Sequence, residues 1–253
     1  MEVEEEGGGE EVEEEDEKPK SNTKIEMNKY VHAYIIIMRV LTFDTETTGL
    51  PKRYSGSVYD SDNWPHIVQL SMLLYDLDAQ KTIAVHDFII KLPANVVITQ
   101  ENTNIHGITN EMSNQKGVDI KEALLCMSAC LDSAQVLVAH NLEFDTNMIA
   151  AECNRVGYPS IFRIKPFAGY CTMLHGMELC NLKMISRRTN REIIKFPKLI
   201  ELYQKLFNEA PNNLHNSLVD VFVCFRCYHK LTQVHDILAT DQDLKRQFDR
   251  ITS

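Results

Sequence analysis

An uncharged, β-branched run that ends in two carboxylates is the feature of this sequence that most restricts its fold. Residues 38–45 (MRVLTFDT) carry no charge between Arg39 and Asp44, which is typical of a central strand covered on both faces. Residues i and i+2 of a strand point to the same side. We therefore expect Asp44 and Glu46 to project together at the end of a buried strand.

The pattern that follows predicts a mixed sheet covered by helices. Two further strand-like runs, 66–75 and 82–92, are separated by a short turn at 76–81. Beyond residue 99 the apolar residues recur at three- and four-residue spacing, which predicts helices. The expected helices cover residues 99–105, 120–132, 142–156, 196–207 and 214–231, with a short buried strand at 136–139. Strands that come first and then alternate with helices are typical of such a sheet.

Polar residues follow the short strand at 136–139. His140 and Asn141 fall at the junction with the next helix, and Asp145 lies in the first turn of that helix. Side chains at such a junction can face a cleft. The same residues also fit a structural role, because Asn141 can be an N-cap and Asp145 can interact favourably with the helix dipole.

The predicted helix at 214–231 contains both His215 and Asp220. Asp220 is flanked by Leu218, Val219, Val221 and Phe222, an unfavourable position for an unpaired carboxylate. His215 lies five residues earlier, so the two side chains need not touch, although both can border one cavity. Carboxylates that lie close together repel each other unless a cation lies between them, and Mg²⁺ prefers oxygen ligands.

These motifs together resemble the three exonuclease motifs of the DnaQ-like superfamily, in its DEDDh branch. This is the family of the polymerase III epsilon proofreading subunit, and it includes the RNase T group. The matching segments, in order, are Asp44-x-Glu46-Thr-Thr-Gly, His140-Asn-x-x-Phe-Asp145 and His215-x-x-x-x-Asp220. A sister branch carries Tyr four residues before the last Asp, where this chain has Asn216. The similarity extends from about Met38 to Leu231.

The resemblance implies an α/β, ribonuclease H-like fold, with a central mixed five-stranded sheet and helices on both faces. It implies metal-dependent 3′–5′ hydrolysis of phosphodiester bonds in DNA, releasing nucleoside 5′-monophosphates by a two-metal mechanism. The implied ligands of two Mg²⁺ ions, which Mn²⁺ can replace, are Asp44, Glu46, Asp145 and Asp220. His215 is the implied general base.

The resemblance also implies contacts with the substrate. Glu101 to Ile108 is similar to a family segment whose Glu and His contact the terminal nucleotide. The implied substrate-binding residues are Thr47, Leu50, Glu101, His106, His140 and Asn141. Taken alone, Gly107 also fits a helix C′ residue with His106 in the last turn. The implied partner is a single-stranded or frayed 3′ end, DNA rather than RNA, with a polymerase in trans as a further partner and no membrane.

Two other functions fit the same residues. One is a 3′–5′ exoribonuclease that trims RNA ends. The other is a catalytically weak, nucleic-acid-binding or polymerase-associated module, although the complete set of five motif residues argues against it. No residue type decides between ribose and deoxyribose, because recognition of the 2′-OH depends on geometry.

The negative net charge of the chain does not exclude a polyanionic partner, because the charge is unevenly distributed. The 253 residues include 26 Lys+Arg and 36 Asp+Glu, a formal net charge of −10, whereas nucleic acid is bound through basic surfaces. Residues 1–17 hold 11 of the acidic residues and no Lys or Arg, so residues 18–253 have a net charge of +1. We expect residues 1–29 to form a disordered acidic tail, residues 30–235 the exonuclease domain, and residues 236–253 a C-terminal extension with one more helix.

A basic cluster lies between the second and third motifs. It consists of Lys183, Arg187, Arg188, Arg191, Lys195 and Lys198, with Glu192 as its one acidic residue. Such a cluster can follow a phosphate backbone, or it can be a solvated loop.

Cysteine use and the N-terminal sequence indicate the compartment. Seven cysteines and an acidic N-terminus without a secretory signal favour a reducing, intracellular location, either cytoplasm or nucleus. Cys224 and Cys227 lie on an apolar helix, where we expect them to be small core residues. The longest apolar run is far shorter than the ~20 residues of a transmembrane helix.

Overall fold

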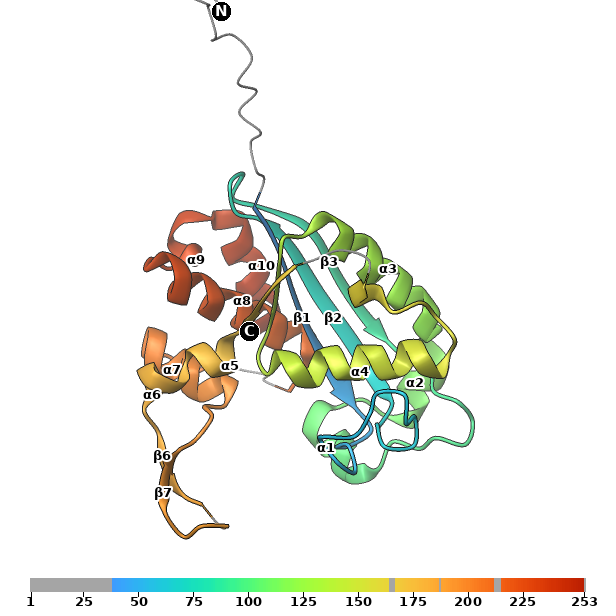
Figure 1. Ribbon diagram of the computed structural model, residues 1–253. Coiled ribbons are helices and arrows are strands. Elements are labelled where there is room, and N and C mark those ends of the chain that lie inside the picture. Colours follow the sequence, from blue (N-terminus) through green and yellow to red (C-terminus); the bar gives the residue numbers. More distant parts are fainter. Residues whose placement is uncertain (1–37, 164–166, 187, 212–214, 253) are drawn as a thin grey trace, which may run out of the picture. The chain divides into compact units, whose positions relative to one another are not determined.

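A five-stranded mixed sheet lies at the centre of the protein (Figure 1). The computed structural model describes residues 38–163, 167–186, 188–211 and 215–252, so the expected tail lies outside the described residues. The strands are β1 (Arg39–Thr47), β2 (Ile67–Asp76), β3 (Lys81–Ile89), β4 (Val136–Ala139) and β5 (Ala168–Cys171), in the order β3-β2-β1-β4-β5. β1 pairs antiparallel with β2, and β2 antiparallel with β3, whereas β1, β4 and β5 run parallel. The predicted α/β fold with a mixed five-stranded sheet is confirmed.

Helices cover both faces of this sheet (Figure 1). α3 (Ile120–Ser133) and α4 (Leu142–Arg155) pack on one face, against Leu41 and Phe43 of β1. α7 (Leu199–Phe207) and α8 (Ser217–Gln233) pack on the other face, where Val40 belongs to the same cluster. Successive residues of β1 thus point to opposite layers, as expected for a strand buried on both faces.

Several short elements join these layers. They are α1 (Gln100–His106), α2 (Asn110–Lys116), the 3₁₀ turn η1 (Ile161–Arg163), α5 (Thr172–His175), α6 (Met177–Cys180), β6 (Lys183–Ile185), β7 (Glu192–Ile194) and α9 (Ile237–Thr240). β6 and β7 form a separate antiparallel hairpin, which projects from the body in Figure 1. It carries most of the basic cluster.

The last residues of the chain join the core beside α8. α9 and α10 (Gln242–Thr252) contribute Ile237, Leu244 and Phe248 to the same apolar cluster as α8. Asp236 also forms an ion pair with Arg226 of α8, at 2.5 Å. In the part of the chain that the structure describes, no helix combines the length and the apolar character needed to cross a bilayer.

Three predicted element boundaries differ from the structure by three residues each. α8 begins at Ser217 rather than near residue 214, because the side chain of Asn216 caps it by accepting the backbone N–H groups of Leu218 and Val219. His215 therefore precedes the helix. α7 begins at Leu199 rather than 196, since the residue before Pro197 is disfavoured from the helical conformation. β3 ends at Ile89 rather than 92, beyond which only an isolated bridge is formed.

Candidate active site

Three carboxylates from two elements converge where β1 ends. Asp44 and Glu46 project from β1, and Asp220 projects from the first turn of α8. One carboxylate oxygen of each residue lies within 4.8 Å of the others. The structure thus brings together three of the four acidic residues that the sequence motifs single out.

Ser217 fixes the N-terminus of α8 to β1. Its hydroxyl donates a hydrogen bond to the backbone carbonyl of Asp44, at 2.8 Å, and its backbone N–H donates to the side chain of Gln69, at 3.2 Å. Ser217 is fully buried. Because Asp220 lies one turn further along the same helix, this anchor holds the Asp220 carboxylate near Asp44. In the sequence, Ser217 is distinguished only by its position within the third motif.

Asp145 reaches the site from the other helical layer. It lies in the first turn of α4, is buried, and accepts hydrogen bonds from the backbone N–H and the hydroxyl of Thr45, at 3.1 and 2.7 Å. Burial and then the charge of Asp44 raise its pKa well above the usual carboxyl value. Asp145 therefore interacts electrostatically with Asp44 and Glu46 while its carboxylate is hydrogen-bonded to Thr45, the residue between them.

The electrostatics of the site favour a bound cation. Burial raises the pKa of Asp44 to about 6. Burial and then the charge of Asp44 raise the pKa of Asp220 to about 8. The pKa of Glu46 rises to about 9, through burial and the charges of Asp44, Asp220 and Asp145. A divalent ion would remove this mutual repulsion and keep the carboxyls ionised.

One carboxylate oxygen of Asp220 also indicates that the site favours a bound cation. Oδ2 of Asp220 accepts the backbone N–H of His215 at 3.3 Å, whereas buried Oδ1 has no hydrogen-bond partner among the described residues. A buried carboxylate oxygen without a partner is costly. Since all the converging donors are oxygens, a hard ion such as Mg²⁺ or Mn²⁺ fits them.

His215 lies beside the carboxylates with an unusual backbone conformation. Its φ is 72° and its side chain is exposed. Positive φ is uncommon for residues other than glycine, and such conformations cluster at functional sites. The hydrogen bond from its N–H to Asp220 ties this conformation to the acidic group.

His140 is held within the protein by both ring nitrogens. Nδ1 lies 2.9 Å from the hydroxyl of Thr172, and Nε2 lies 3.0 Å from the carbonyl of Pro197. Burial lowers its pKa to about 4, so the ring is neutral at pH 7; its Nε2–H then donates to Pro197 while Nδ1 accepts from Thr172. His140 thus joins the end of β4 to α5 and to the segment before α7.

Asn141 begins α4 without capping it through its side chain. The residue occupies the N-cap position, as the structural alternative predicted, but it has φ 84° and its side chain makes no hydrogen bond to the helix. Asn141 lines an open apolar groove of about 1000 Å³ together with Leu142, Phe162, Leu174 and Phe196.

The remaining predicted contact residues surround the loop after β1. Asn102 of α1 donates to the carbonyl of Thr48 at 2.5 Å, which ties α1 to this loop. His106 is buried beside the backbone of Thr47, and burial lowers its pKa. Leu50 is 71% exposed, and Glu101 is exposed in the first turn of α1. Gly107 ends α1 in the left-handed conformation, as the structural alternative predicted.

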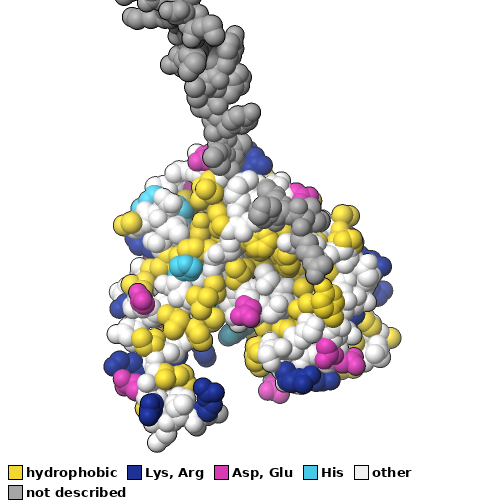
Figure 2. Space-filling model, viewed as in Figure 1, with side chains coloured by type: hydrophobic (Ala, Val, Ile, Leu, Met, Phe, Trp, Pro, Cys, Tyr) yellow, Lys and Arg dark blue, Asp and Glu magenta, His cyan; other side chains and the backbone are white. Residues whose placement is uncertain are grey.

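The basic cluster is divided between paired and exposed cations. Lys183 pairs with Glu192 across the β6–β7 hairpin at 2.9 Å, and Lys195 pairs with Glu201 at 2.5 Å. Arg188 is exposed in the turn that joins the two strands. Arg191, Lys198 and several apolar residues of the hairpin are exposed as well, and Figure 2 shows Lys and Arg side chains gathered on this projection. Arg187 lies outside the described residues.

The sheet order and the acidic group define a ribonuclease H-like protein with a candidate metal-dependent hydrolytic site. The family model described as exonuclease (RNase_T) matches residues 41–228, most of the chain. The chain therefore belongs to this exonuclease family of the DnaQ-like superfamily. No curated protein matches the sequence significantly.

Solved structures of exonuclease I share the fold. One, an exonuclease I structure that suggests how processivity is achieved, is 16% identical over 84% of this chain, with a TM-score of 0.56. Escherichia coli exonuclease I in complex with a dT13 oligonucleotide is 15% identical over 84% of this chain (TM-score 0.56), and the enzyme from Methylocaldum szegediense is 14% identical over 78% (TM-score 0.53). The matched parts cover 43%, 43% and 41% of those chains, so this chain corresponds to less than half of each.

Proposed function

We propose that this chain is a divalent-metal-dependent 3′–5′ exonuclease that releases nucleoside 5′-monophosphates from the 3′ end of DNA. The observation that carries the proposal is the convergence of Asp44, Glu46 and Asp220 within 4.8 Å, with pKa values raised to between about 6 and 9. Membership in the exonuclease family and the fold shared with exonuclease I support it.

In this proposal two Mg²⁺ ions, or Mn²⁺ in their place, are held by the acidic residues. Asp44, Glu46 and Asp220 would hold one ion, and Asp44 would also contribute to the second together with Asp145, directly or through water. When bound, the ions supply positive charge that activates water and stabilises the leaving 3′ oxygen. One exonuclease I structure was determined with zinc bound, so the identity of the metal belongs to the test.

His215 is the proposed general base. Imidazole accepts a proton readily near neutral pH, and among the described histidines only His215 is hydrogen-bonded to the carboxylate group, through its backbone N–H. Its exposure supports the assignment, because a base that accepts a proton from attacking water must also return it to solvent. The backbone hydrogen bond to Asp220 keeps this residue beside the site.

The proposed substrate is a single-stranded or frayed 3′ end. Thr47, Leu50, Glu101 and His106 would contact the terminal nucleotide from the loop after β1 and from α1. Exposed Leu50 suits a wedge against the last base, since stacking tolerates any sequence. Asn141 would contact the substrate from the edge of the apolar groove. His140 would support the binding site from inside the protein. Oligonucleotide complexes of exonuclease I support DNA over RNA, and action with a polymerase in trans, in replication or repair, is part of the same proposal.

The deciding experiment compares three 3′-labelled substrates with the full-length chain: single-stranded DNA, duplex DNA with a mismatched end, and RNA. We expect label release as mononucleotides with Mg²⁺ or Mn²⁺ and none with EDTA. Asp44→Asn and Asp220→Asn should each lower the rate by at least ~10²-fold without unfolding the protein. Glu122→Gln, which alters an exposed carboxylate on α3, is the matched control.

Other results of this experiment would contradict the site assignment or favour one of the alternative functions. Wild-type rates in either Asp variant would show that the site assignment is wrong. Faster release from RNA would favour the exoribonuclease, and binding without cleavage in any metal would favour the catalytically weak binding module.

A further inference from the structure

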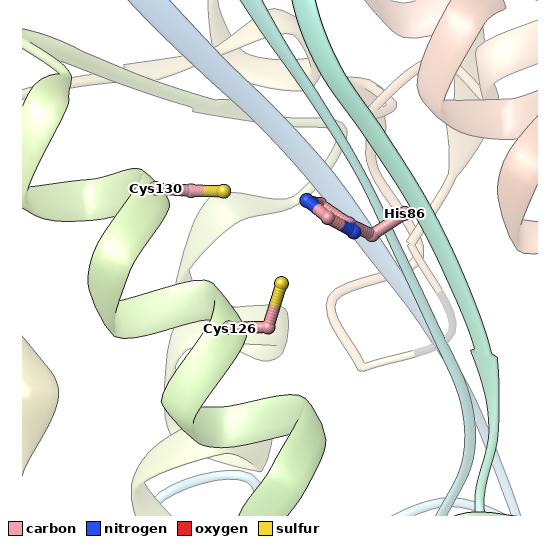
Figure 3. Close-up of side chains that lie close together, drawn as sticks. All are labelled: His86, Cys126 and Cys130. Carbon is pink, nitrogen blue, oxygen red and sulfur yellow. The ribbon is translucent and has the colours of Figure 1, made fainter.

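A second group of metal-ligating side chains lies between the edge of the sheet and α3. His86 of β3 and Cys126 and Cys130 of α3 each offer one ligand atom, and these atoms lie within 4.8 Å of one another. Figure 3 shows the two thiols pointing from the helix toward the imidazole on the strand. The proposed exonuclease mechanism uses none of these residues.

The positions of these three side chains follow from the helical period of α3 and the alternation of side chains along β3. Cys126 and Cys130 are four residues apart, so they lie one above the other on the same face of the helix. The same spacing places the two metal-binding histidines of the H-E-x-x-H motif on one helical face. His86 lies on the side of β3 that faces α3, because Ala84 and Phe88, two residues away on either side, pack against the core beneath that helix.

The sheet separates this group from the acidic site. His86 is in register with Met72, and Met72 with Phe43, whose side chains belong to the layer under α3. Asp44 is in register with Ser71, one position along, and its carbonyl is bonded by Ser217 on the α8 side. The His86 group therefore lies on the opposite face of the sheet from Asp44, Glu46 and Asp220, and its donors are chemically different.

The surroundings suit a bound ion that enters from solvent. Cys130 is 6% exposed, whereas His86 and Cys126 are half-buried. The His86 ring stacks on Phe88 with a centroid distance of 5.8 Å and an interplanar angle of 5°, which restricts its rotation. Burial raises the pKa of the Cys130 thiol to about 11 and also raises that of Cys126. A coordinating metal deprotonates such thiols outright.

We propose that His86, Cys126 and Cys130 bind one thiophilic divalent ion of the Zn²⁺ class, with a fourth position open to solvent. Zn–S bonds of about 2.3 Å and Zn–N bonds of about 2.0 Å place tetrahedral ligand atoms roughly 3.5–3.8 Å apart. Small side-chain rotations bring atoms within 4.8 Å to that spacing. Thiolate and imidazole select zinc rather than Mg²⁺, so this ion is distinct from those of the nuclease site.

The ion would join β3 to α3. β3 is an edge strand of the sheet, paired only with β2 among the described strands, and an edge strand gains most from an added link. A disulfide between Cys126 and Cys130 would link two turns of one helix and would leave His86 without a role. The presence of the imidazole on a second element therefore favours a metal over a redox pair.

Cobalt(II) titration of the full-length protein tests this proposal. The protein is stripped of metal, fully reduced with a phosphine and titrated while the near-ultraviolet thiolate-to-cobalt absorption is recorded. We expect saturation at one equivalent and displacement by Zn²⁺. The carboxylate site contains no sulfur and cannot produce this band, so the result is independent of nuclease activity.

Three variants complete the test. Cys126→Ser should abolish the band. His86→Gln should weaken cobalt binding by at least ~10–100-fold, because removing a mere hydrogen-bond partner of a metal ligand already lowers metal affinity by that much. Cys180→Ser changes another half-buried cysteine, on α6, and should leave the band unchanged. Zn²⁺ should raise the melting temperature of the wild type more than that of Cys126→Ser. The proposal fails if reduced wild type gives no band, if Cys126→Ser keeps the full band, or if the freshly purified protein contains a Cys126–Cys130 disulfide.

Discussion

The Asp145 carboxylate is bound by Thr45, the residue between the two acidic residues of β1. Both the backbone N–H and the hydroxyl of Thr45 donate to the same oxygen of Asp145, at 3.1 and 2.7 Å. These bonds oppose the rise in the pKa of Asp145 caused by burial and by Asp44. The strand that supplies two metal-ligand candidates therefore also orients a third acidic residue, which comes from the opposite helical layer.

We expect Thr45→Val to lower the rate of 3′ nucleotide release by about 10–100-fold, the usual effect of removing a partner of a metal ligand. The substitution keeps the β-branched shape and removes one of the two bonds that orient Asp145. Single-turnover rates at several Mg²⁺ concentrations would show whether metal affinity or the chemical step changes.

Thr42→Val is the matched control for this change. Thr42 is also buried on β1, but its hydroxyl has no hydrogen-bond partner among the described residues. Replacing an unpaired hydroxyl by a methyl group should leave the rate unchanged and the stability equal or higher. Equal losses of activity in both variants would contradict a specific role for Thr45.

The pKa of Glu46 predicts that metal-free protein loses stability as the pH rises. Its folded pKa, about 9, lies above the ordinary value of 4.5. Between about pH 4.5 and pH 9 the folded state therefore holds a proton that the unfolded chain releases. This contribution to stability is complete below about pH 4.5 and is lost as the pH rises through about 9. Mg²⁺ should restore stability most strongly at the alkaline end.

Glu46→Gln isolates this effect, because the amide cannot ionise. In EDTA, urea unfolding should show that the variant is more stable than the wild type by at least about 1 kcal/mol near pH 9. This is a low threshold, because a pKa shift of one unit already corresponds to about 1.4 kcal/mol. The difference should shrink toward about pH 5. Glu143→Gln, on the exposed side of α4, should show no such trend. A difference between Glu46→Gln and wild type that does not vary with pH would contradict the raised pKa.

The hydrogen bonds of His140 predict a loss of stability rather than of substrate affinity. His140→Ala leaves the buried carbonyl of Pro197 without this partner, which should cost about 1–3 kcal/mol. The hydroxyl of Thr172 loses its bond to His140 but keeps the carbonyl of Ala139 and the thiol of Cys224 as partners. We expect the variant to have a lower free energy of unfolding and a reduced kcat, with KM little changed. Glu101→Ala, at an exposed position, should instead raise KM and change stability by less than about 0.5 kcal/mol. A raised KM with unchanged stability in His140→Ala would assign it to direct substrate contact.

The central elements and the acidic residues could be predicted because their signals are local. The period of β1 placed Asp44 and Glu46 on one side, and the apolar neighbours of Asp220 marked it as unusual. Cys224 and Cys227 are buried core residues, as expected from the apolar helix that carries them. A buried strand or helix imposes its periodicity on the sequence, so it can be recognised from sequence alone.

The supporting contacts could not be predicted, since they join segments that are distant in sequence. Ser217 bonds to Asp44, and Thr45 to Asp145, only after α8 and α4 have packed on opposite faces of the sheet. The grouping of His86 with two cysteines likewise depends on which face α3 covers. The three-residue strands β6 and β7 are exposed throughout, so no buried face gave them an apolar period.

The exposed arginines of the β6–β7 hairpin predict a salt-dependent contribution to nucleic-acid binding. Arg188 and Arg191 lie at the turn and belong to neither of the two ion pairs that neutralise Lys183 and Lys195. Arg188→Ala/Arg191→Ala should weaken binding of single-stranded DNA to the full-length chain in EDTA. The slope of log K against log salt should fall by about 0.7 for each phosphate that the variant no longer neutralises.

The control for the hairpin variant removes two exposed cations elsewhere. Lys116→Ala/Lys121→Ala changes net charge by the same amount on α2 and α3, so it separates a local interaction from a general charge effect. We expect the control to keep the wild-type slope, because screening limits the reach of exposed charges to about 10 Å at moderate salt. Equal slopes for wild type and the hairpin variant, measured by fluorescence anisotropy between low and moderate salt, would show that this cluster is a solvated hairpin and does not follow the phosphate backbone.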